Sequence, residues 1–325
     1  MTTGIALRDD NRALTESLQT VIDAWLDYER GEGASAATLA AYRKGLDVWA
    51  AWLTESNATP GTVTPATVRQ FKADLSERYS AQTVNLRLSA IRSFYRFLVN
   101  TDRLPVNPAG EVKGVKRTKS RIHKRDALTN GEVVGVLRTC DLGTLEGVRD
   151  RAILSLLAYC ALREVEIQRA DIGDLKTQGD RLVLAVQGKG RTEADERVII
   201  PRSQEDVVRA WLAHRLTFGE HDAGDPLFVS LSRRNRGQRL TTRSIRRIVK
   251  ARYALAGVVG NGKTTHSLRH SAITNAIRQG ATPMQVQAMA RHASFDTTLG
   301  YYHEVSRLDN PAEDLIRYEG GDAGR

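Results

Sequence analysis

The sequence predicts a mainly α-helical protein of two domains, with a small antiparallel sheet in the second domain. Apolar residues recur at helical spacing through residues 1–100, a basic stretch without apolar periodicity follows residue 112, and two β-rich runs flank a glycine-containing turn near residue 189. A chain of 325 residues also exceeds the roughly 250–300 residues at which single cores stop growing. We expect a first domain over 1–112, a linker over 113–126, a second domain over 127–319 and a disordered tail over 320–325.

Four helices are expected in the first domain, near residues 14–26, 35–53, 64–75 and 80–100. Ser35 and Thr64 are suitable N-cap residues, and proline follows Thr64 at the first helical position. The polar face of the fourth helix carries Arg87, Arg92 and Arg96. These arginines can contact phosphates or simply face solvent.

The linker is strongly basic. Residues 113–125 contain no acid and seven basic residues: Lys113, Lys116, Arg117, Lys119, Arg121, Lys124 and Arg125. Like charges repel, so this stretch is expected to be extended. It is suited to lie along a DNA backbone, and it would also serve as a plain tether.

The second domain begins with a helix near residue 129, followed by an apolar helix over 148–162. The β-rich runs 182–186 and 197–200 read as a hairpin with Lys189 near its turn. Helices are expected again over 204–216 and 242–255, and the remainder reads as helical with breaks at Gly280, Pro283 and His292.

The net charge of +10 is unevenly distributed. Residues 1–112 hold 12 basic and 13 acidic residues, whereas residues 113–325 hold 36 and 25. A local basic excess indicates a polyanionic partner, most commonly nucleic acid, although it can also serve solubility. No apolar run is long enough for a membrane span, and the first eleven residues lack a secretory signal. Cys140 and Cys160 exclude a disulfide scaffold and a cysteine-rich zinc site, which favours a reducing, cytoplasmic location.

Two short motifs have alternative explanations. Residues 257–264 match the phosphate-binding pattern GxxxxGK[ST], but the preceding segment reads as a helix rather than the required strand. His266 and His270 have the spacing of a helical zinc site, but the glutamate of HExxH is missing and Arg269 would place a cation beside the metal. We therefore expect a loop at the first motif and no bound metal at the second.

Several clusters gain meaning from their order: Arg163 after an apolar helix, Lys189, His266-x-x-Arg269, His292 and then Tyr301. Together they resemble the tyrosine recombinase family, the phage integrase-like proteins. Ala-Leu-Arg-x-x-Glu resembles the first arginine box with Glu166 at its acidic position, and His-x-Leu-Arg-His resembles the second box. His292 and the following Thr-Thr-x-x-Tyr-x-His resemble the nucleophile box, which favours Tyr301 over Tyr302. The sequence departs from the family at 160–161, where Thr-Gly is frequent, and at 290–291, where Leu-Gly is usual.

The resemblance implies a SAM-like, DNA-clamping N-terminal domain and a mixed α/β catalytic domain. It also implies roles for individual residues. Arg163, Arg269 and His292 would stabilise a phosphoryl transition state, so that no metal or other cofactor is needed. Tyr301 would be the nucleophile, His266 its base and Lys189 the acid for the leaving oxygen. Glu166 would orient His266 or an arginine, and His270 reads as a buried structural residue.

The implied partner is a double-stranded DNA site, with self-association into a tetramer on two such sites. An accessory protein or a second recombinase is a possible further partner. The expected location is the cytoplasm, in association with the nucleoid. Residues 310–316 could dock on a neighbouring protomer or pack on their own domain. Two other functions stay open from the sequence: a catalytically silent DNA-binding regulator and a type IB topoisomerase.

Overall fold

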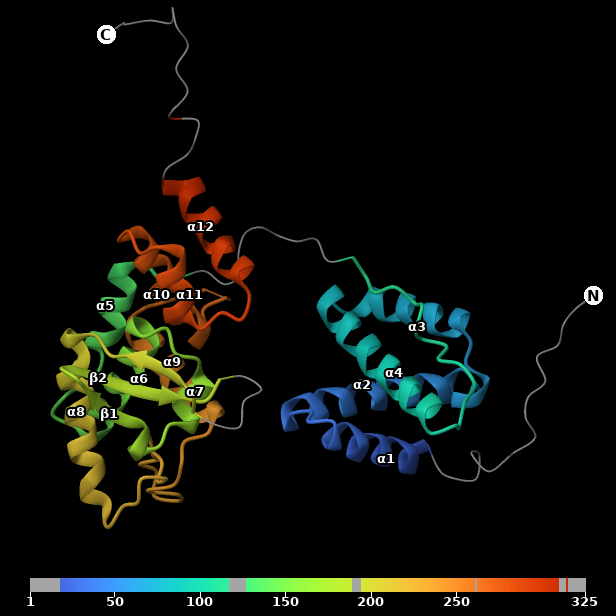
Figure 1. The fold of residues 1–325 in the computed structure, drawn as a ribbon, viewed down its shortest axis with the longest axis horizontal. Coiled ribbons are helices and arrows are strands. Elements are labelled where there is room, and N and C mark those ends of the chain that lie inside the picture. The colour runs from blue at the N-terminus through green and yellow to red at the C-terminus, as the bar shows by residue number, and fades with distance from the viewer. Residues whose placement is uncertain (1–17, 117–126, 189–193, 261, 310–313, 315–325) are drawn as a thin grey trace, which may run out of the picture. The chain divides into compact units, whose positions relative to one another are not determined.

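The structure is a computed structural model that describes residues 18–116, 127–188, 194–260, 262–309 and 314. The chain divides into two compact units, Met1–Lys119 and Ser120–Arg325, and each is mainly helical (Figure 1). A three-stranded antiparallel sheet lies in the second unit, so the predicted fold class is confirmed. Among the described residues, no helix combines the length and the apolar character that a membrane crossing requires.

The first unit is a bundle of four α-helices. They are α1 (Leu18–Gly31), α2 (Ala36–Glu55), α3 (Pro65–Arg78) and α4 (Ala81–Asn100), with a short 3-10 turn, η2 (Pro60–Thr62), before α3. The hydroxyls of Ser35, Thr64 and Ser80 cap α2, α3 and α4, as side-chain oxygens do at orphan N–H groups. Aromatic side chains fill the core, and Trp49 packs edge-on against Phe71 with ring centroids 4.7 Å apart.

The chain remains attached to this bundle beyond the predicted boundary at residue 112. The Asn85 side chain accepts a hydrogen bond from the Val115 N–H and donates one to the Val115 carbonyl, at 2.8 and 2.9 Å. Lys72 Nζ donates to the Lys113 carbonyl at 3.2 Å. The first residues of the predicted linker therefore follow the surface of α3 and α4. Residues 117–126 lie outside the described residues.

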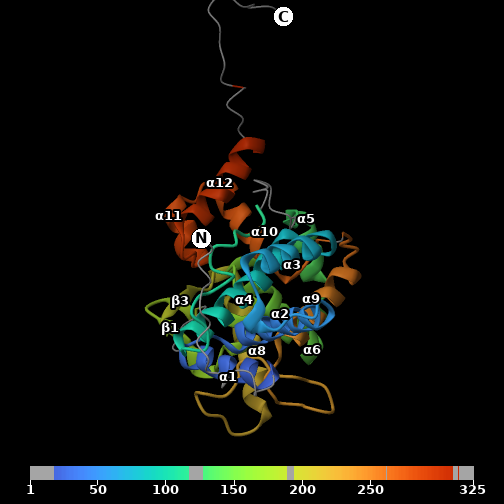
Figure 2. The ribbon, with the colours of Figure 1, turned by 90° about the vertical axis from the view of Figure 1, so that its right-hand side faces the viewer.

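The second unit contains the remaining elements (Figures 1 and 2). In chain order they are α5 (Asn130–Arg138), α6 (Leu145–Tyr159), α7 (Glu164–Arg169), η3 (Ile172–Asp174), β1 (Leu175–Gln178), β2 (Arg181–Val186), β3 (Glu196–Ile199), α8 (Arg202–Arg215), η4 (Leu216–Phe218), α9 (Thr242–Leu255), α10 (Thr265–Arg278), α11 (Pro283–Ala290) and α12 (Phe295–Asp309). The apolar helix α6 is buried along most of its length and packs against α8 and α10.

The predicted hairpin is confirmed, because β2 and β3 pair antiparallel with Leu184 opposite Val198. Strand β1, which pairs with the other edge of β2, was not predicted. Its sequence Leu-Lys-Thr-Gln is mostly exposed and lacks alternation of apolar and polar residues. The predicted helix over 148–162 is wrong at its end. Helix α6 stops at Tyr159, and Ala161 then adopts a left-handed backbone with φ of 50°.

A separate apolar cluster joins α10, α11 and α12, which lie side by side in both views (Figures 1 and 2). Its buried members include Ile273 of α10, Val286 of α11, and Tyr301 and Val305 of α12. Ala161, at the end of the α6–α7 connection, belongs to the same cluster. This packing brings the segments that carry Arg163, Arg269, His292 and Tyr301 together, although they are far apart in the sequence.

Candidate active site

Arg163 stands immediately before α7, and its contacts fix the start of that helix. Its backbone N–H donates to Glu166 Oε2 at 2.6 Å, and its guanidinium donates to Glu166 Oε1 at 2.7 Å. A further bond runs from the guanidinium to the Arg291 carbonyl at 3.1 Å. Glu166 is buried, whereas a quarter of the Arg163 side chain stays exposed. The guanidinium is therefore held by Glu166 and the Arg291 carbonyl, while part of the side chain remains accessible.

A third arginine, Arg291, was not among the predicted site residues. Its side chain is buried and pairs with Glu166 Oε2 at 2.7 Å. Burial alone would raise the pKa of Glu166, but the Arg291 charge and the Arg163 backbone N–H hold it below its ordinary value. Glu166 thus stays ionised between the guanidinium groups of Arg163 and Arg291.

Both departures from the family pattern lie at positions where the backbone favours glycine. Ala161 has φ of 50° and Arg291 has φ of 52°, in the left-handed region where glycine has no steric penalty. These are the two positions at which the resembling family usually has glycine. The sequence does show that Arg291 replaces the glycine that is usual in the family. It does not indicate that the Arg291 side chain contacts Glu166.

Arg269 is buried on α10 and donates hydrogen bonds to the carbonyls of Ala161 and Ala290. Among the described residues, no carboxylate lies within ion-pair distance of its guanidinium. Burial, followed by the charges of Arg163 and Arg291, lowers the pKa of Arg269 to about 9. The group remains charged at pH 7, and a bound anion would relieve the repulsion among the three cations.

Tyr301 of α12 lies between two histidines. Its hydroxyl is hydrogen bonded to Nδ1 of His270, and the two ring centroids are 5.4 Å apart. On the other side the His292 ring stacks on the tyrosine at 5.7 Å with an interplanar angle of 13°. His292 Nδ1 is engaged by the Thr298 hydroxyl at 2.9 Å, which fixes the orientation of the imidazole. The neighbouring Tyr302 instead donates its hydroxyl to the Ala281 carbonyl.

The predicted base His266 lies one turn before His270 on α10, with ring centroids 6.4 Å apart. Its charge contributes to lowering the pKa of Glu164, which also accepts hydrogen bonds from Arg246 and Thr265, although burial of Glu164 opposes these effects. The hydrogen bond to the Tyr301 hydroxyl comes from His270. The structure thus gives His270 a direct contact with the predicted nucleophile, where a buried structural role was expected.

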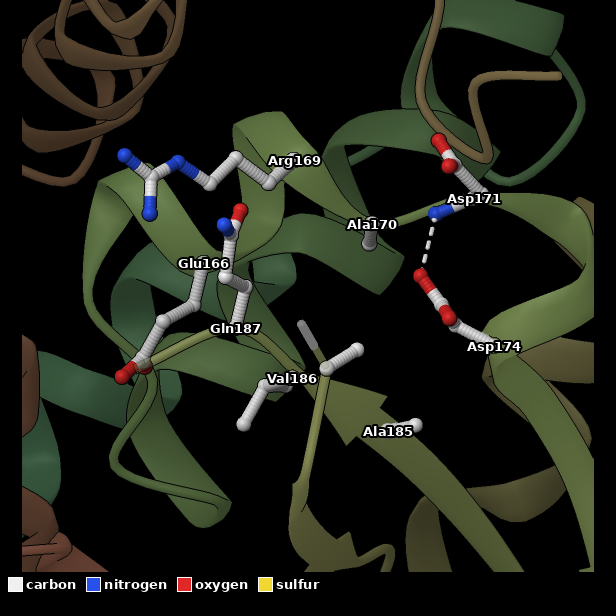
Figure 3. Close-up of a pocket in the computed structure, with 9 residues that line it drawn as sticks. Glu166, Arg169, Ala170, Asp171, Asp174, Ala185, Val186 and Gln187 are labelled. Atoms are coloured by element: carbon white, nitrogen blue, oxygen red, sulfur yellow. Dashed lines mark hydrogen bonds between the residues drawn. The ribbon is translucent and has the colours of Figure 1, made fainter. Parts of the chain in front are cut away.

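The predicted acid Lys189 lies outside the described residues, but both ends of its connection are described. Figure 3 shows a cavity in which Val186 and Gln187, at the end of β2, face Glu166 of α7, and Ala194 belongs to the same lining. Glu196, at the start of β3, lies 3.6 Å from the Arg291 guanidinium. The connection that carries Lys189 therefore leaves and rejoins the sheet beside the Glu166–Arg291 pair.

The predicted DNA-binding residues differ in their surroundings. Arg87 is buried, with its guanidinium 3.8 Å from the centre of the Tyr79 ring. Arg92 is half-buried and donates to the Val112 carbonyl, whereas Arg96 and Lys116 are exposed. The other predicted linker contacts lie outside the described residues: Arg117, Lys119, Arg121, Lys124 and Arg125.

A basic face on α9 was missed from the sequence. Arg243, Arg246, Arg247 and Lys250 are exposed, whereas Ile245 and Val249 on the opposite face are buried. The four basic residues have the i, i+3, i+4 and i+7 spacing of one helical face, and this signal was available in the sequence.

The first alternative motif, residues 257–264, is a connection between helices. Helix α9, not a strand, precedes residues 257–264, and the Lys263 ammonium donates to the Ala127 carbonyl at 3.0 Å and lies 3.6 Å from Glu132. This arrangement is that of a connection between helices rather than a phosphate-binding loop. Within the described ranges, no three His, Cys, Asp or Glu side chains are grouped as metal ligands.

Comparison with known proteins agrees with this organisation. Residues 126–307 match the phage integrase family, and residues 22–102 match the phage integrase N-terminal SAM-like domain. The tyrosine recombinase XerC of Myxococcus xanthus is 32% identical over 244 residues, covering 73% of this chain and 77% of that protein. The tyrosine recombinase XerD of Proteus mirabilis is 28% identical over 302 residues, covering 91% and 90%.

Solved structures show the same fold. A XerH site-specific recombinase bound to a palindromic difH substrate superposes with a TM-score of 0.72 at 17% identity, covering 95% of this chain and 89% of that one. A lambda integrase dimer bound to a core site superposes with a TM-score of 0.64 at 15% identity, covering 87% and 97%. The chain therefore belongs to the phage integrase family and is a tyrosine recombinase.

Proposed function

We propose that this enzyme is a site-specific DNA recombinase that cuts and rejoins DNA through a 3′-phosphotyrosyl intermediate, without metal or ATP. One observation carries the proposal: Tyr301 lies in the same chain and the same apolar cluster as the segments that hold Arg269 and His292. Arg269 immediately precedes His270 on α10, and Nδ1 of His270 is hydrogen bonded to the Tyr301 hydroxyl. Nucleophile and cation are thus neighbours before any DNA is bound.

The cations suit a phosphodiester. Phosphoryl transfer builds negative charge on the non-bridging oxygens, and fixed donors stabilise it without reorganisation. Arg163 and Arg269 would grip these oxygens, since guanidinium groups bind phosphate bidentately. His292, oriented by Thr298, would donate from its second ring nitrogen. Loss of one such donor typically costs about 10²–10³ in rate.

The covalent step conserves the energy of the bond that is cut. The Tyr301 oxygen attacks phosphorus, the P–O5′ bond breaks, and the leaving oxygen takes a proton from an acid. Lys189 is the proposed acid, because its connection begins and ends beside the Glu166–Arg291 pair. The phosphotyrosyl ester stays available for attack by another 5′ hydroxyl, so religation needs no nucleotide cofactor.

The proposed partner is a double-stranded DNA site, with assembly into a tetramer on two sites. The related XerH structure is a complex with its difH substrate, and a lambda integrase has been solved as a tetramer on a Holliday junction. The exposed basic face of α9 is suited to the DNA backbone. Activity on DNA would place the protein in the cytoplasm with the nucleoid. The proposed docking segment 310–316 lies outside the described residues except for Asp314.

The nucleophile is tested with a nicked suicide substrate, which traps the covalent adduct when the cut strand diffuses away. Tyr301→Phe should bind this DNA and form no SDS-stable adduct, whereas Tyr302→Phe should retain the adduct because its hydroxyl bonds the Ala281 carbonyl. The reverse pattern would move the nucleophile by one residue. Absence of any adduct with the wild-type protein would instead favour a silent DNA-binding regulator.

The metal-free mechanism predicts an unchanged rate of adduct formation in excess EDTA. Loss of cleavage on chelation, restored by a divalent cation, would contradict it. For the acid, Lys189→Ala should be slow on ordinary DNA and should recover on DNA with a 5′-bridging sulfur, since a thiolate leaves without a proton. A variant that stays slow on that substrate would argue against the role of Lys189.

A further inference from the structure

We propose that His270, rather than His266, accepts the proton of Tyr301 during strand cleavage. This inference rests on the function proposed above and assigns one further catalytic residue to the same site. Helix α10 carries both histidines on one face with Arg269 beside them. The structure must therefore distinguish two imidazoles that are separated by a single helical turn.

His270 is in direct contact with the proposed nucleophile. Nδ1 of His270 is hydrogen bonded to the Tyr301 hydroxyl, and the two rings are tilted by 35° at 5.4 Å. A general base must lie within hydrogen-bond reach of the proton that it removes. His270 meets this requirement in the arrangement of the free protein, and no movement of α12 relative to α10 is needed to form the pair.

His266 has different surroundings from His270. This histidine lies close enough to the Glu164 carboxylate for its charge to influence that group, which the Thr265 hydroxyl and Arg246 also hold ionised. His266 is thus placed beside a carboxylate that Arg246 and Thr265 hold, whereas His270 is placed beside the hydroxyl whose proton must leave.

Packing holds the Tyr301 ring in its position beside His270. The Tyr301 ring is buried and stacked on His292, and Thr298 holds His292 in place through a 2.9 Å hydrogen bond. A phenol with a pKa of about 10 is ionised in roughly one molecule in a thousand at pH 7, so it requires an acceptor as attack begins. Nδ1 of His270 accepts when its ring carries the proton on Nε2.

The Tyr301 O–H bond breaks as its oxygen forms a bond to phosphorus, and the proton moves to His270 Nδ1. The P–O5′ bond breaks, and the 5′ oxygen takes its proton from the separate acid. Religation reverses the sequence: the imidazolium returns its proton to the phenol oxygen as the incoming 5′ hydroxyl displaces it. The histidine therefore ends each complete reaction neutral.

Single-turnover cleavage of a suicide substrate tests the assignment. His270→Ala should slow adduct formation by about 10²–10⁴-fold, the usual contribution of a general base. His270→Asn should be nearly as slow, because its amide can hold the hydroxyl but cannot take up a proton. Wild-type melting temperature and DNA affinity check that both variants fold. If His270→Ala unfolds, His270→Asn carries the same test.

A bypass reaction supplies the second readout. In the Tyr301→Phe protein, hydrogen peroxide can attack phosphorus in place of the phenol. This reaction still needs the cations but no longer uses a proton acceptor for tyrosine. Adding His270→Ala to Tyr301→Phe should therefore change peroxide cleavage less than about threefold, whereas adding Arg269→Ala should lower it by about 10²-fold or more.

Three outcomes would overturn the inference. Restored adduct formation in His270→Asn would make His270 a positioning residue. A wild-type rate in His270→Ala would remove it from the reaction altogether. Equal loss of adduct formation and peroxide cleavage on adding His270→Ala would place its effect on the phosphate. Failure of the proposed function itself would look different, because the wild-type protein would then form no adduct.

Discussion

Arg291 occupies a backbone position that favours glycine, and its side chain is part of the candidate site. Its left-handed conformation directs the chain out of α11, and its side chain returns to the buried carboxylate of Glu166. Its carbonyl also accepts a hydrogen bond from Arg163. The residue thus supports Arg163 twice, once through the shared carboxylate and once directly.

Replacement of Arg291 by alanine should destabilise the second domain. The variant removes one of the two guanidinium partners of the buried Glu166 carboxylate. Because Arg163 remains, the cost should lie below about 3–5 kcal/mol, the cost of a buried charge left with no partner. Arg202→Ala is the matched control, because Arg202 and Asp180 form an exposed pair worth about 0–1 kcal/mol. Urea unfolding at pH 7 measures both. A loss below about 1 kcal/mol for Arg291→Ala would contradict the structure of the cluster.

The same pair predicts a pH dependence. Burial raises the pKa of Glu166, but the Arg291 charge, the hydrogen bonds from Arg163 and Arg291 and the Arg163 charge together hold the folded-state pKa below its ordinary value of 4.5. Its stabilising contribution is therefore complete above pH 4.5 and is lost as the pH falls through the folded-state pKa. The difference in unfolding free energy between wild type and Arg291→Ala should shrink below pH 4.5. A difference that grows on acidification would have the wrong sign.

At the scale of elements, the start of α6 depends on a glycine. A Cβ on Gly147 would lie 1.9 Å from the Asp141 carbonyl oxygen, which real contacts never allow. Thr144 accepts the Gly147 N–H at 3.0 Å, so this turn is fixed by its cap and cannot shift freely. Because the Gly147 backbone approaches the Asp141 backbone this closely, α6 begins immediately after the preceding loop. The helix then ends at Tyr159, next to Cys160 and the connection that carries Arg163.

Two glycine substitutions should therefore have opposite effects. Gly147→Ala should destabilise by about 1–3 kcal/mol, the usual cost of overpacking, despite the better helix propensity of alanine. Gly135→Ala in α5 should stabilise by up to about 1 kcal/mol, because a Cβ there meets nothing within 4 Å. Thermal unfolding of the two variants compares them directly. Stabilisation by both substitutions would show that the α6 turn relaxes easily.

The elements also show what the sequence can and cannot predict. Helical periodicity predicted α9 at the observed residues, and caps predicted α2 and α3, because these signals are local. The order of Arg163, Arg269, His292 and Tyr301 indicated the family. Strand β1 was missed because its stability comes from pairing with β2 rather than from its own pattern. The contact of Tyr301 with His270 joins α12 to α10, and no local pattern encodes it.

In the molecule as a whole, part of the basic excess of residues 113–325 lies on the surface of α9 and of the loop before it. Helix α9 presents Arg243, Arg247 and Lys250 to solvent, and Arg246 beside them is shared with Glu164. The loop before α9 exposes Arg233, Arg234 and Arg236. Basic side chains without buried partners release counterions from DNA when they bind phosphates, which makes the affinity dependent on salt.

The dependence of DNA affinity on salt should respond to α9. If two residues of this face contact phosphates, the double variant Arg243→Ala with Arg247→Ala should reduce the slope of log affinity against log salt by about 2. The control removes two arginines from α8, Arg202 and Arg209, and should leave the slope nearly unchanged. Fluorescence anisotropy at several salt concentrations measures both. Equal changes in the two variants would reduce the role of α9 to net charge.

The residue that becomes attached to DNA can be identified chemically. Wild-type protein trapped on a suicide substrate is digested with protease and nuclease, and the nucleotide-bearing peptide is sequenced by tandem mass spectrometry. We predict that the nucleotide is attached to the oxygen of Tyr301, through its 3′ phosphate. Attachment at Tyr302, at another side chain or through a 5′ phosphate would contradict the account.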